Sequence, residues 1–452
     1  MLAGAGALAE ALAARLRDAG WDVRDEADDV DLVVWLADDP GQDWDSAAGA
    51  LREALLLAGR TRAVLDRAAE TGRAGFVAVT RLDGVLGYSG VDPASAVTGG
   101  LPGLVKTLAA EAPGLFCRAV DLHPELSDEQ CAAALLAELH DADTALHQVG
   151  YDAERVRRTV VAGPDSEPDP ELPGCAPRPA PGPDDLLVVS GGGRGVTAAC
   201  AIGLARRWRT GLLLLGRTPL DDEPEWARDV AEPRLKAAIA AHLRDSGGTP
   251  TPRDVEPVYR TLVAQREIRG TLAEIRAAGA RVDYLAVDVA DADAVAAALS
   301  EHRDRITGVV HGAGALSDRL VADKTAADVD AVFAPKLAGL RSILDAVDRD
   351  RLRHVLLFSS VAGFFGNRGQ ADYAMANESL NRLACTLARQ LPDAAVASIN
   401  WGPWAGGMVT PELQRMFRER GVEPIPLDAG VRTVVDHFAA DRPVPVVSVV
   451  SG

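Results

Sequence analysis

This 452-residue sequence has fewer basic than acidic residues, 47 against 66, and its formal net charge of -19 at pH 7 would repel the phosphate backbone of nucleic acid. No run of about eighteen apolar residues occurs, so we expect no membrane span. The five cysteines show no paired spacing, which argues against a disulfide framework or a zinc site. These absences predict a cytoplasmic protein without a metal, in which any anionic cofactor must find local positive charge.

The length and the 48% hydrophobic content predict two folded domains. The stretch GPDSEPDPELPGCAPRPAPGPDD contains eight prolines, which prevent a helix or a central strand from continuing. We therefore predict a first domain at residues 1–162, a proline-rich linker at 163–185 and a second domain at 186–452.

Short apolar runs alternate with longer helical patterns on both sides of this linker. The clearest runs are DLVVWLA and AGFVAVT in the first part, and LLVVS, GLLLLG, VDYLAVDV, ITGVVHGAG, HVLLFSS and AVASINW in the second. Strands that are apolar throughout and separated by helices indicate parallel sheets covered on both faces. The predicted fold class is therefore α/β.

The two parts also resemble each other when RAGFVAVTRLDGVLG is laid over LRHVLLFSSVAGFFG. In that register Arg81 stands opposite Ser360, and Ala94 stands opposite Tyr373. The first part would then be a degenerate copy without the chemistry of the second, although two parallel-sheet units can also look alike by chance. No strand is expected before Ala3, so this copy starts late, as a fragment of a longer polypeptide would.

A glycine-rich turn follows the run LLVVS and leads directly into a helix. Such a turn lets backbone amides approach a pyrophosphate, and the helix N-terminus adds partial positive charge. Thr197 occupies the position of the usual last glycine, and a structural turn without a cofactor is the alternative. The candidate cofactor-binding residues here are Ser190, Gly191, Gly192, Gly193, Arg194, Gly195 and Val196.

The end of the run GLLLLGRT bears on the choice of nicotinamide cofactor. An acidic residue there would hold the ribose hydroxyl of NAD, but Arg217 and Thr218 offer a cation and a hydroxyl. Together with Arg194 they suit the 2′-phosphate of NADPH, unless these arginines are only solvated surface charges. Further candidate contacts are Asp288 and Val289 for the adenine, and Gly312, Ala313 and Gly314 beneath the cofactor.

The stretch SSVAGFFGNRGQADYAMAN places Ser360 thirteen residues before Tyr373. Reduction of a ketone by hydride needs an acid, and tyrosine, with a pKa of about 10, serves well only when an ammonium stabilises its anion. Only four lysines occur in the chain, and one of them, Lys336, lies in FAPKLAGL. Four residues past Tyr373, where short-chain reductases usually carry lysine, stands Asn377.

These residues resemble the ketoreductase domain of type I polyketide synthases, a branch of the short-chain dehydrogenase/reductase superfamily. In that family lysine and asparagine exchange places, so the resemblance implies a catalytic tetrad of Lys336, Ser360, Tyr373 and Asn377. It covers nearly the whole chain and implies two Rossmann-like doubly wound parallel-sheet subdomains, of which the first is truncated, degenerate and structural.

The stretch SINWGPWAGGMV resembles the family's segment that contacts the nicotinamide. It implies cofactor contacts at Pro403 and Trp404 and a lid over residues 405–425. The D-selective members of the family resemble one another in a Leu-Asp-Asp loop, which Leu316-Ser317-Asp318 matches except at its first aspartate. The L-selective members carry a tryptophan eight residues before the catalytic tyrosine, and this chain has Phe365 there. Leu316, Asp318, Phe365 and Met408 are therefore candidate substrate-orienting residues, and the product is expected to be the D (3R) alcohol; the alternative is that Asp318 only caps a helix.

The sequence departs from the family's common pattern in two places, and both indicate a subgroup of ketoreductases. The turn SGGGRGVT differs from the common form, and an insertion at 219–265 predicts two helices separated by GGTPTP. Both features resemble the ketoreductases of iterative enediyne and polyunsaturated fatty acid synthases, and the high alanine and arginine content favours the enediyne type.

The implied reaction is NADPH-dependent reduction of a β-ketoacyl thioester on an acyl carrier protein to the β-hydroxyacyl thioester. The acyl carrier protein and the other domains of a parent synthase would be its partners. The alternatives are a ketoreductase of a polyunsaturated fatty acid synthase, a free-standing short-chain ketone reductase, and a non-catalytic NADPH-binding or docking module.

Overall fold

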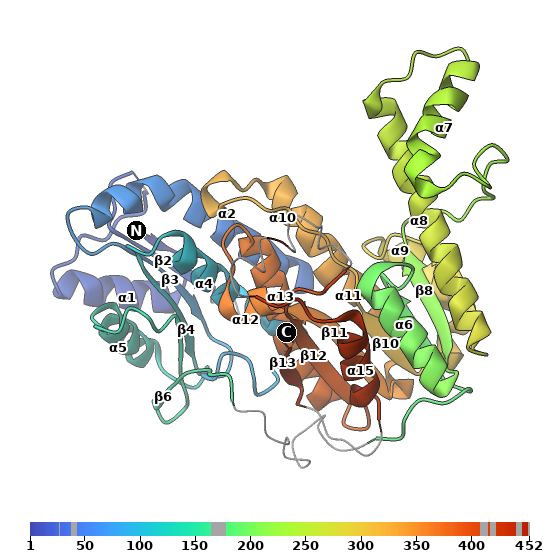
Figure 1. The fold of residues 1–452 in the computed structure, drawn as a ribbon. Coiled ribbons are helices and arrows are strands. Elements are labelled where there is room, and N and C mark those ends of the chain that lie inside the picture. Colours follow the sequence, from blue (N-terminus) through green and yellow to red (C-terminus); the bar gives the residue numbers. More distant parts are fainter. Residues whose placement is uncertain are drawn as a thin grey trace.

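The computed structural model describes residues 1–26, 28–37, 43–163, 178–406, 415, 422–439 and 445–450, and it contains two sheets with helices on both faces (Figure 1). Strands lie at every apolar run named above. No helix in this described part is long and apolar enough to cross a membrane.

The first sheet follows the chain order β1-β2-β3-β4-β5-β6 and is parallel except between its last two strands. Its strands are β1 (Leu2–Ala3), β2 (Leu32–Ala37), β3 (Gly75–Thr80), β4 (Phe116–Leu122), β5 (Gln148–Tyr151) and β6 (Arg157–Arg158). Its helices are α1 (Ala7–Asp18), α2 (Trp44–Ala69), α3 (Pro93–Thr98), α4 (Leu101–Glu111) and α5 (Asp128–Leu139). A two-residue strand, β1, lies at Leu2–Ala3 and pairs with β2, so the expectation that no strand precedes Ala3 was wrong.

The second sheet is parallel throughout and has the order β13-β12-β11-β10-β7-β8-β9. Its strands are β7 (Leu186–Ser190), β8 (Gly211–Gly216), β9 (Val282–Ala286), β10 (Gly308–His311), β11 (His354–Ser360), β12 (Ala395–Trp401) and β13 (Val447–Val450). Its helices are α6 (Gly195–Trp208), α7 (Glu232–Asp245), α8 (Pro252–Ala277), α9 (Ala292–Leu299), α10 (Ala326–Phe333), α11 (Gly339–Ala346), α12 (Val361–Phe365), α13 (Ala371–Gln390) and α15 (Leu427–His437).

The strand order of the second sheet reverses between β7 and β10. In open parallel sheets, ligands bind in the crevice at the carboxyl ends of the strands where the order reverses. The described part of the first sheet runs in chain order and therefore has no such crevice. The two sheets thus share an architecture, but within the described residues only the second has a place for a dinucleotide.

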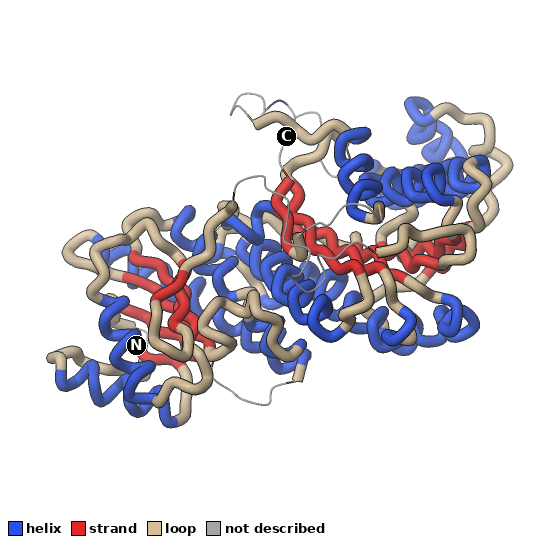
Figure 2. Tube along the Cα trace, turned by 90° about the horizontal axis from the view of Figure 1, so that it is seen from below, coloured by secondary structure: helices blue, strands red, loops and turns tan. Residues whose placement is uncertain are grey.

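One hydrophobic core joins the two units. Leu51 and Leu104 of the first unit belong to the same buried cluster as Met375, Leu380 and Leu383 of α13. Figure 2 shows helices lying between the two sheets, and α13 packs against α3 and α4 of the first unit as well as β11 and β12 of the second. The helix that carries Tyr373 is therefore held from both sides.

The predicted insertion forms a helical hairpin that projects from the second unit (Figure 1). Helices α7 and α8 are separated where GGTPTP predicted a break, and α8 continues into the segment before β9. The hairpin has a small core of its own around Leu235, Ile239 and Val255.

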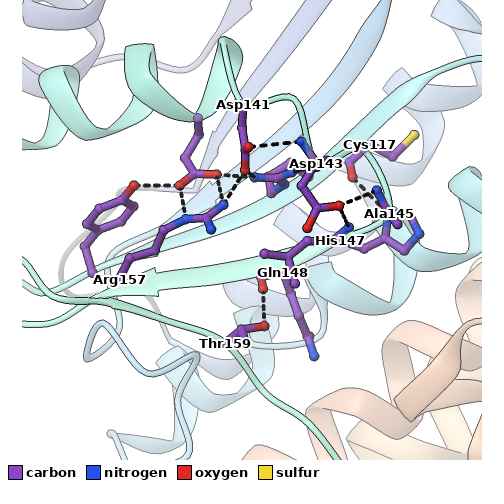
Figure 3. Close-up of polar contacts among 12 residues, drawn as sticks. Cys117, Asp141, Asp143, Ala145, His147, Gln148, Arg157 and Thr159 are labelled. Atoms are coloured by element: carbon purple, nitrogen blue, oxygen red, sulfur yellow. Dashed lines mark hydrogen bonds and ion pairs between the residues drawn. The ribbon is translucent and has the colours of Figure 1, made fainter.

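A cluster of charges around the buried Arg118 and Glu138 joins several elements of the first unit (Figure 3). Glu138 accepts hydrogen bonds from Arg157 at 2.6 Å and from the hydroxyl of Tyr151 at 2.5 Å. Arg118, which is fully buried on β4, donates to Glu138 and, at 3.0 Å, to Asp141. These bonds tie β4, α5, β5 and the short β6 together.

Candidate active site

The four residues of the predicted tetrad come from three neighbouring elements of the second unit. Ser360 ends β11 and caps α12, with its hydroxyl accepting from the amide of Ala362 at 3.2 Å. Tyr373 and Asn377 lie one turn apart on α13, and Lys336 lies in the turn between α10 and α11. The structure therefore brings these side chains together at the carboxyl end of β11.

Lys336 sits in a π-helical turn, η3 (Ala334–Ala338). Pro335 has no amide hydrogen, so it interrupts the helical ladder, and the amide of Gly339 reaches back to the carbonyl of Ala334. The side chain is buried, its Nζ donates to the carbonyl of Phe358 at 2.5 Å, and Nζ lies 5.7 Å from the centre of the Tyr373 ring. Burial lowers the pKa of Lys336 to about 7, so its charge is adjustable near neutral pH.

Gly314 makes room for this lysine. A Cβ added at Gly314 would approach the Cε atom of Lys336 to 2.9 Å, so a larger residue would push the ammonium out of place. This close approach explains why the segment predicted to pass beneath the cofactor carries glycine there.

His311 links the cofactor turn to the lysine turn, a role that sequence reasoning missed because a histidine at a strand end has an ordinary structural explanation. Burial lowers the pKa of His311 to about 3, so the ring is neutral. Its Nδ1 lies 2.8 Å from the hydroxyl of Ser190 and its Nε2 lies 3.0 Å from the carbonyl of Lys336. In the tautomer that satisfies both contacts, Nε2 donates to the carbonyl and Nδ1 accepts from Ser190, whose oxygen accepts from the amide of Ala313.

Tyr373 is a partly buried acid whose pKa depends on its neighbours. Burial raises the pKa of Tyr373, while hydrogen bonds from the side chains of Ser360 and Asn377 lower it. The amide group of Asn377 donates to the carbonyl of Tyr373 at 2.8 Å, and its Oδ1 is buried without a partner in the described structure. This oxygen of the predicted tetrad can therefore accept a further hydrogen bond, as a proton relay requires.

The predicted cofactor turn has the backbone geometry that glycine allows. Gly191 and Gly195 adopt φ angles of 72° and 69°, and a Cβ at Gly191 would come within 3.1 Å of Gly312. Thr197 is buried, and its hydroxyl would lie 2.4 Å from a Cβ on Gly312. The close helix-to-strand contact that the missing glycine would provide is thus made by Gly312 on the opposite segment.

The remaining predicted cofactor residues border the same edge of the sheet. Arg217 is exposed at the end of β8, and Arg194 at the N-terminus of α6 lies 3.9 Å from Glu267. Thr218 accepts a hydrogen bond at its carbonyl from Tyr284, and Asp288 is exposed after β9. The turn and its packing are completed by Gly192, Gly193, Val196 and the buried Val289.

Pro403 and Trp404 follow β12, but the ring of Trp404 is buried against Trp401, with centroids 4.8 Å apart. Any contact between Trp404 and a cofactor would therefore come from its backbone. Met408 and most of the predicted lid lie outside the described residues.

Leu316, Asp318 and Phe365, the predicted substrate-orienting residues that the structure describes, lie on two segments joined by a hydrogen bond from Gln370 to Asp318. Leu316 is 40% exposed and Phe365 is 58% exposed, which is unusual for large apolar side chains. Asp318 accepts a hydrogen bond from Gln370 at 3.0 Å, and its charge raises the pKa of Tyr373. Asp318 does not cap a helix, because the cap of α10 is Thr325. Within the described residues, no group of acidic, histidine or cysteine side chains could hold a metal ion.

Comparison with known proteins matches residues 186–406 to the KR domain family. Over 86% of this chain, one of the polyunsaturated fatty acid synthase subunits of Thraustochytrium sp. is 38% identical. The chain belongs to the ketoreductase domain family of type I polyketide synthases.

Other relatives and solved structures also match most of this chain. A phenolphthiocerol/phthiocerol polyketide synthase protein of Mycobacterium tuberculosis is 30% identical over 90% of the chain. An A-type ketoreductase of a modular polyketide synthase superposes with a TM-score of 0.64 at 26% identity, covering 98% of this chain and 86% of that one. A ketoreductase domain from the bacillaene assembly line has the same fold, with a TM-score of 0.67 at 23% identity over 96% of this chain and 88% of that one.

The two curated relatives are much longer than this chain. The matched part spans 14% of the fatty acid synthase protein and 20% of the mycobacterial protein. Both relatives are large synthase proteins, so domains of this kind work beside others.

Proposed function

We propose that this ketoreductase uses NADPH to reduce a β-ketoacyl thioester, carried by an acyl carrier protein, to the D (3R) β-hydroxyacyl thioester. The observation that carries the proposal is the meeting of Lys336, Ser360, Tyr373 and Asn377 at the carboxyl end of β11, beside the strand reversal. A scaffold or docking module would have no need of a buried lysine over the ring of a partly buried tyrosine.

Each tetrad residue has a distinct task in this proposal. Ser360 polarises the ketone oxygen, and Tyr373 gives its proton to that oxygen as negative charge develops. Lys336 stabilises the resulting tyrosinate, and the free Oδ1 of Asn377 helps return a proton to the site. The nicotinamide, when bound, supplies the hydride.

The residues fit that cofactor in two respects. The glycine turn leads with positive φ angles directly into the N-terminus of α6, a backbone arrangement that suits a pyrophosphate. Arg217 is exposed and, within the described residues, forms no ion pair, so it is available to a 2′-phosphate. Thr218 and Arg194 border the same place.

The stereochemical proposal rests on Asp318 and Phe365. Asp318 lies close enough to Tyr373 to influence its pKa, and Phe365 is exposed on the opposite segment. The two therefore flank the route to the ketone, with Leu316 beside Asp318. Chiral chromatography of the reduced thioester will show the D product if these residues select the ketone face, and a predominantly L product contradicts the proposal.

The type of parent synthase is also a proposal. The hairpin of α7 and α8 and the variant glycine turn favour the iterative synthases, and the composition favours the enediyne type. The 38% identity to a polyunsaturated fatty acid synthase protein supports that synthase as the second candidate. Both candidates share the same ketoreduction and the same acyl carrier partner.

The deciding experiment is turnover of a β-ketoacyl N-acetylcysteamine thioester with NADPH, compared with a small soluble ketone. We expect the thioester to be preferred and Tyr373→Phe to lower its turnover by about 10² to 10⁴, with NADPH still bound. Preference for the small ketone would indicate a free-standing reductase. NADPH binding without turnover of either would indicate a binding module.

A further inference from the structure

The segments that flank the proposed substrate route are held by the first unit, which carries no tetrad of its own. Three polar side chains of helix α4 form hydrogen bonds to the second unit, at residues 321 and 364–369. Lys106 Nζ donates to the carbonyl of Phe364 at 2.7 Å and to Glu378 at 2.6 Å. The hydroxyl of Thr107 accepts from the amide of Asn367 at 3.2 Å.

Glu111 makes the most specific of these contacts. One carboxylate oxygen accepts from the amide of Val321, three residues after Asp318, at 2.9 Å. The other accepts from the amide of Gly369, four residues before Tyr373, also at 2.9 Å. A single carboxylate therefore sets the distance between the loop of Asp318 and the start of the Tyr373 helix.

A glutamate at position 111 does not stabilise helix α4 itself. It is the last residue of α4, where a negative charge opposes the helix dipole, and its side chain is only 1% exposed. Arg62, 3.9 Å away, partly compensates the charge. A buried carboxylate in an unfavourable helical position is retained for what it binds, here two amides of the other unit.

Lys324 joins the same two segments from within the second unit. Its Nζ donates to the carbonyl of Ser317 and, at 2.5 Å, to the carboxylate of Asp372, which directly precedes Tyr373. Both members of this ion pair are almost fully buried. The amide of Arg319 also donates to the carbonyl of Gly369 at 2.9 Å, so the two segments are fixed at several points.

We propose that Glu111, acting from the first unit, and Lys324 are positioning residues for ketoreduction. Together they hold the loop of residues 316–321 against residues 369–372, and so fix the width and handedness of the route by which the ketone reaches Tyr373. The inference rests on the proposed reaction. It gives the first unit a role in stereoselectivity, although none of its residues touches the reacting atoms.

The test is the ratio of major to minor enantiomer formed by Glu111→Gln from the same thioester. Glutamine keeps the shape but turns an N–H toward one of the two amides, so that amide loses its acceptor. We expect the enantiomer ratio to fall about tenfold, with a rise in KM that exceeds the loss in kcat. The matched control is Thr386→Val, which deletes another hydrogen bond between the same two units, from Thr386 to the carbonyl of Val91, far along α13.

An unchanged ratio in folded Glu111→Gln, or an equal change in Thr386→Val, would overturn the inference. Should Glu111→Gln not fold, Lys324→Met tests the same two segments, and an unchanged ratio there overturns it equally. Absence of turnover in the parent protein instead contradicts the proposed reaction, so the two failures are distinguishable.

Discussion

Lys336 shows how one residue depends on a widened helical turn, a glycine and a neutral histidine. The turn at Pro335 directs the side chain inward, Gly314 leaves space for its stem, and His311 holds its backbone. The buried ammonium then titrates near neutrality, with a pKa of about 7. The proposed chemistry at this scale depends on the positive charge of Lys336 lying beside the phenol of Tyr373.

We expect this titration to appear in the pH dependence of kcat/KM. The ammonium stabilises the tyrosinate that forms when Tyr373 gives up its proton, and this help is lost as pH rises above about 7 and Lys336 becomes neutral. The parent should therefore lose activity on the alkaline side, whereas Lys336→Met should be slow at all pH values and lack that limb. The same alkaline limb in Lys336→Met would assign the titration to another group.

We expect Arg217 to determine the preference for NADPH over NADH. Arg217→Asp replaces a partner of the 2′-phosphate with a repelling charge, so binding of NADPH should weaken far more than binding of NADH. Fluorescence titration with both cofactors measures the two affinities. Arg234→Asp, which makes the same charge change on the exposed face of α7, is the control and should leave both unchanged. Equal losses for both cofactors in Arg217→Asp would remove Arg217 from the phosphate site.

At the scale of elements, β4 is instructive because it is a central strand that contains two charged residues. Arg118 and Asp121 are both fully buried within it. Asp121 accepts from the amides of Leu82 and Leu86 at 2.8 Å, and Arg118 enters the charge cluster of Figure 3. Both side chains hydrogen-bond to neighbouring elements, which is why the strand tolerates their charges.

Removing Arg118 should therefore destabilise the first unit strongly. Arg118→Met removes the buried cation from the buried Glu138 and leaves it with Arg157 and the Tyr151 hydroxyl, and we expect a loss of about 3 kcal/mol in the free energy of unfolding. Arg158→Met, which breaks the exposed pair with Asp152, should cost less than about 1 kcal/mol. Urea unfolding measures both, and equal losses would show that the cluster adds nothing beyond a surface ion pair.

For the whole molecule, the buried histidines at the start of β11 and the end of α15 link stability to pH. His354 and His437 both contact the ring of Phe438, with centroids 5.2 Å apart in each case. Three of their ring nitrogens have no hydrogen-bond partner in the described structure. Burial lowers the pKa of His354 to about 4 and that of His437 to about 3.

The folded protein should consequently lose stability in mild acid. Above the unfolded pKa of about 6.5 both histidines are neutral in either state, so pH has no effect through them. Below it the unfolded chain takes up protons that the folded core excludes, and each histidine removes about 1.4 kcal/mol per pH unit until its folded pKa is reached. The free energy of unfolding, measured between pH 7 and 5, should fall less steeply in His437→Leu. The exposed control His140→Gln should keep the parent slope, and an unchanged slope in His437→Leu would contradict the prediction.

Much of the fold was predictable because the second unit's strands are apolar throughout and separated by helices. The glycine turn, the tetrad residues and the two-helix insertion carry local patterns that do not depend on distant contacts. By contrast, β4 was not among the predicted strands, because Arg118 and Asp121 interrupt its apolar run. Their hydrogen-bond partners lie at least twenty residues away in the chain, so the local sequence does not predict that these charges are buried.

The sequence by itself determined the family, the reaction type it implies and the residues proposed to carry it, because turn geometry and spacing along one strand and one helix are local properties. Only the tertiary structure decided that Gly312 replaces the missing glycine opposite Thr197, and that His311 joins Ser190 to Lys336. It alone also placed Glu111 of the first unit on amides more than two hundred residues away. Such contacts depend on how two sheets pack around α13, and packing between distant segments leaves no periodic signal in the chain.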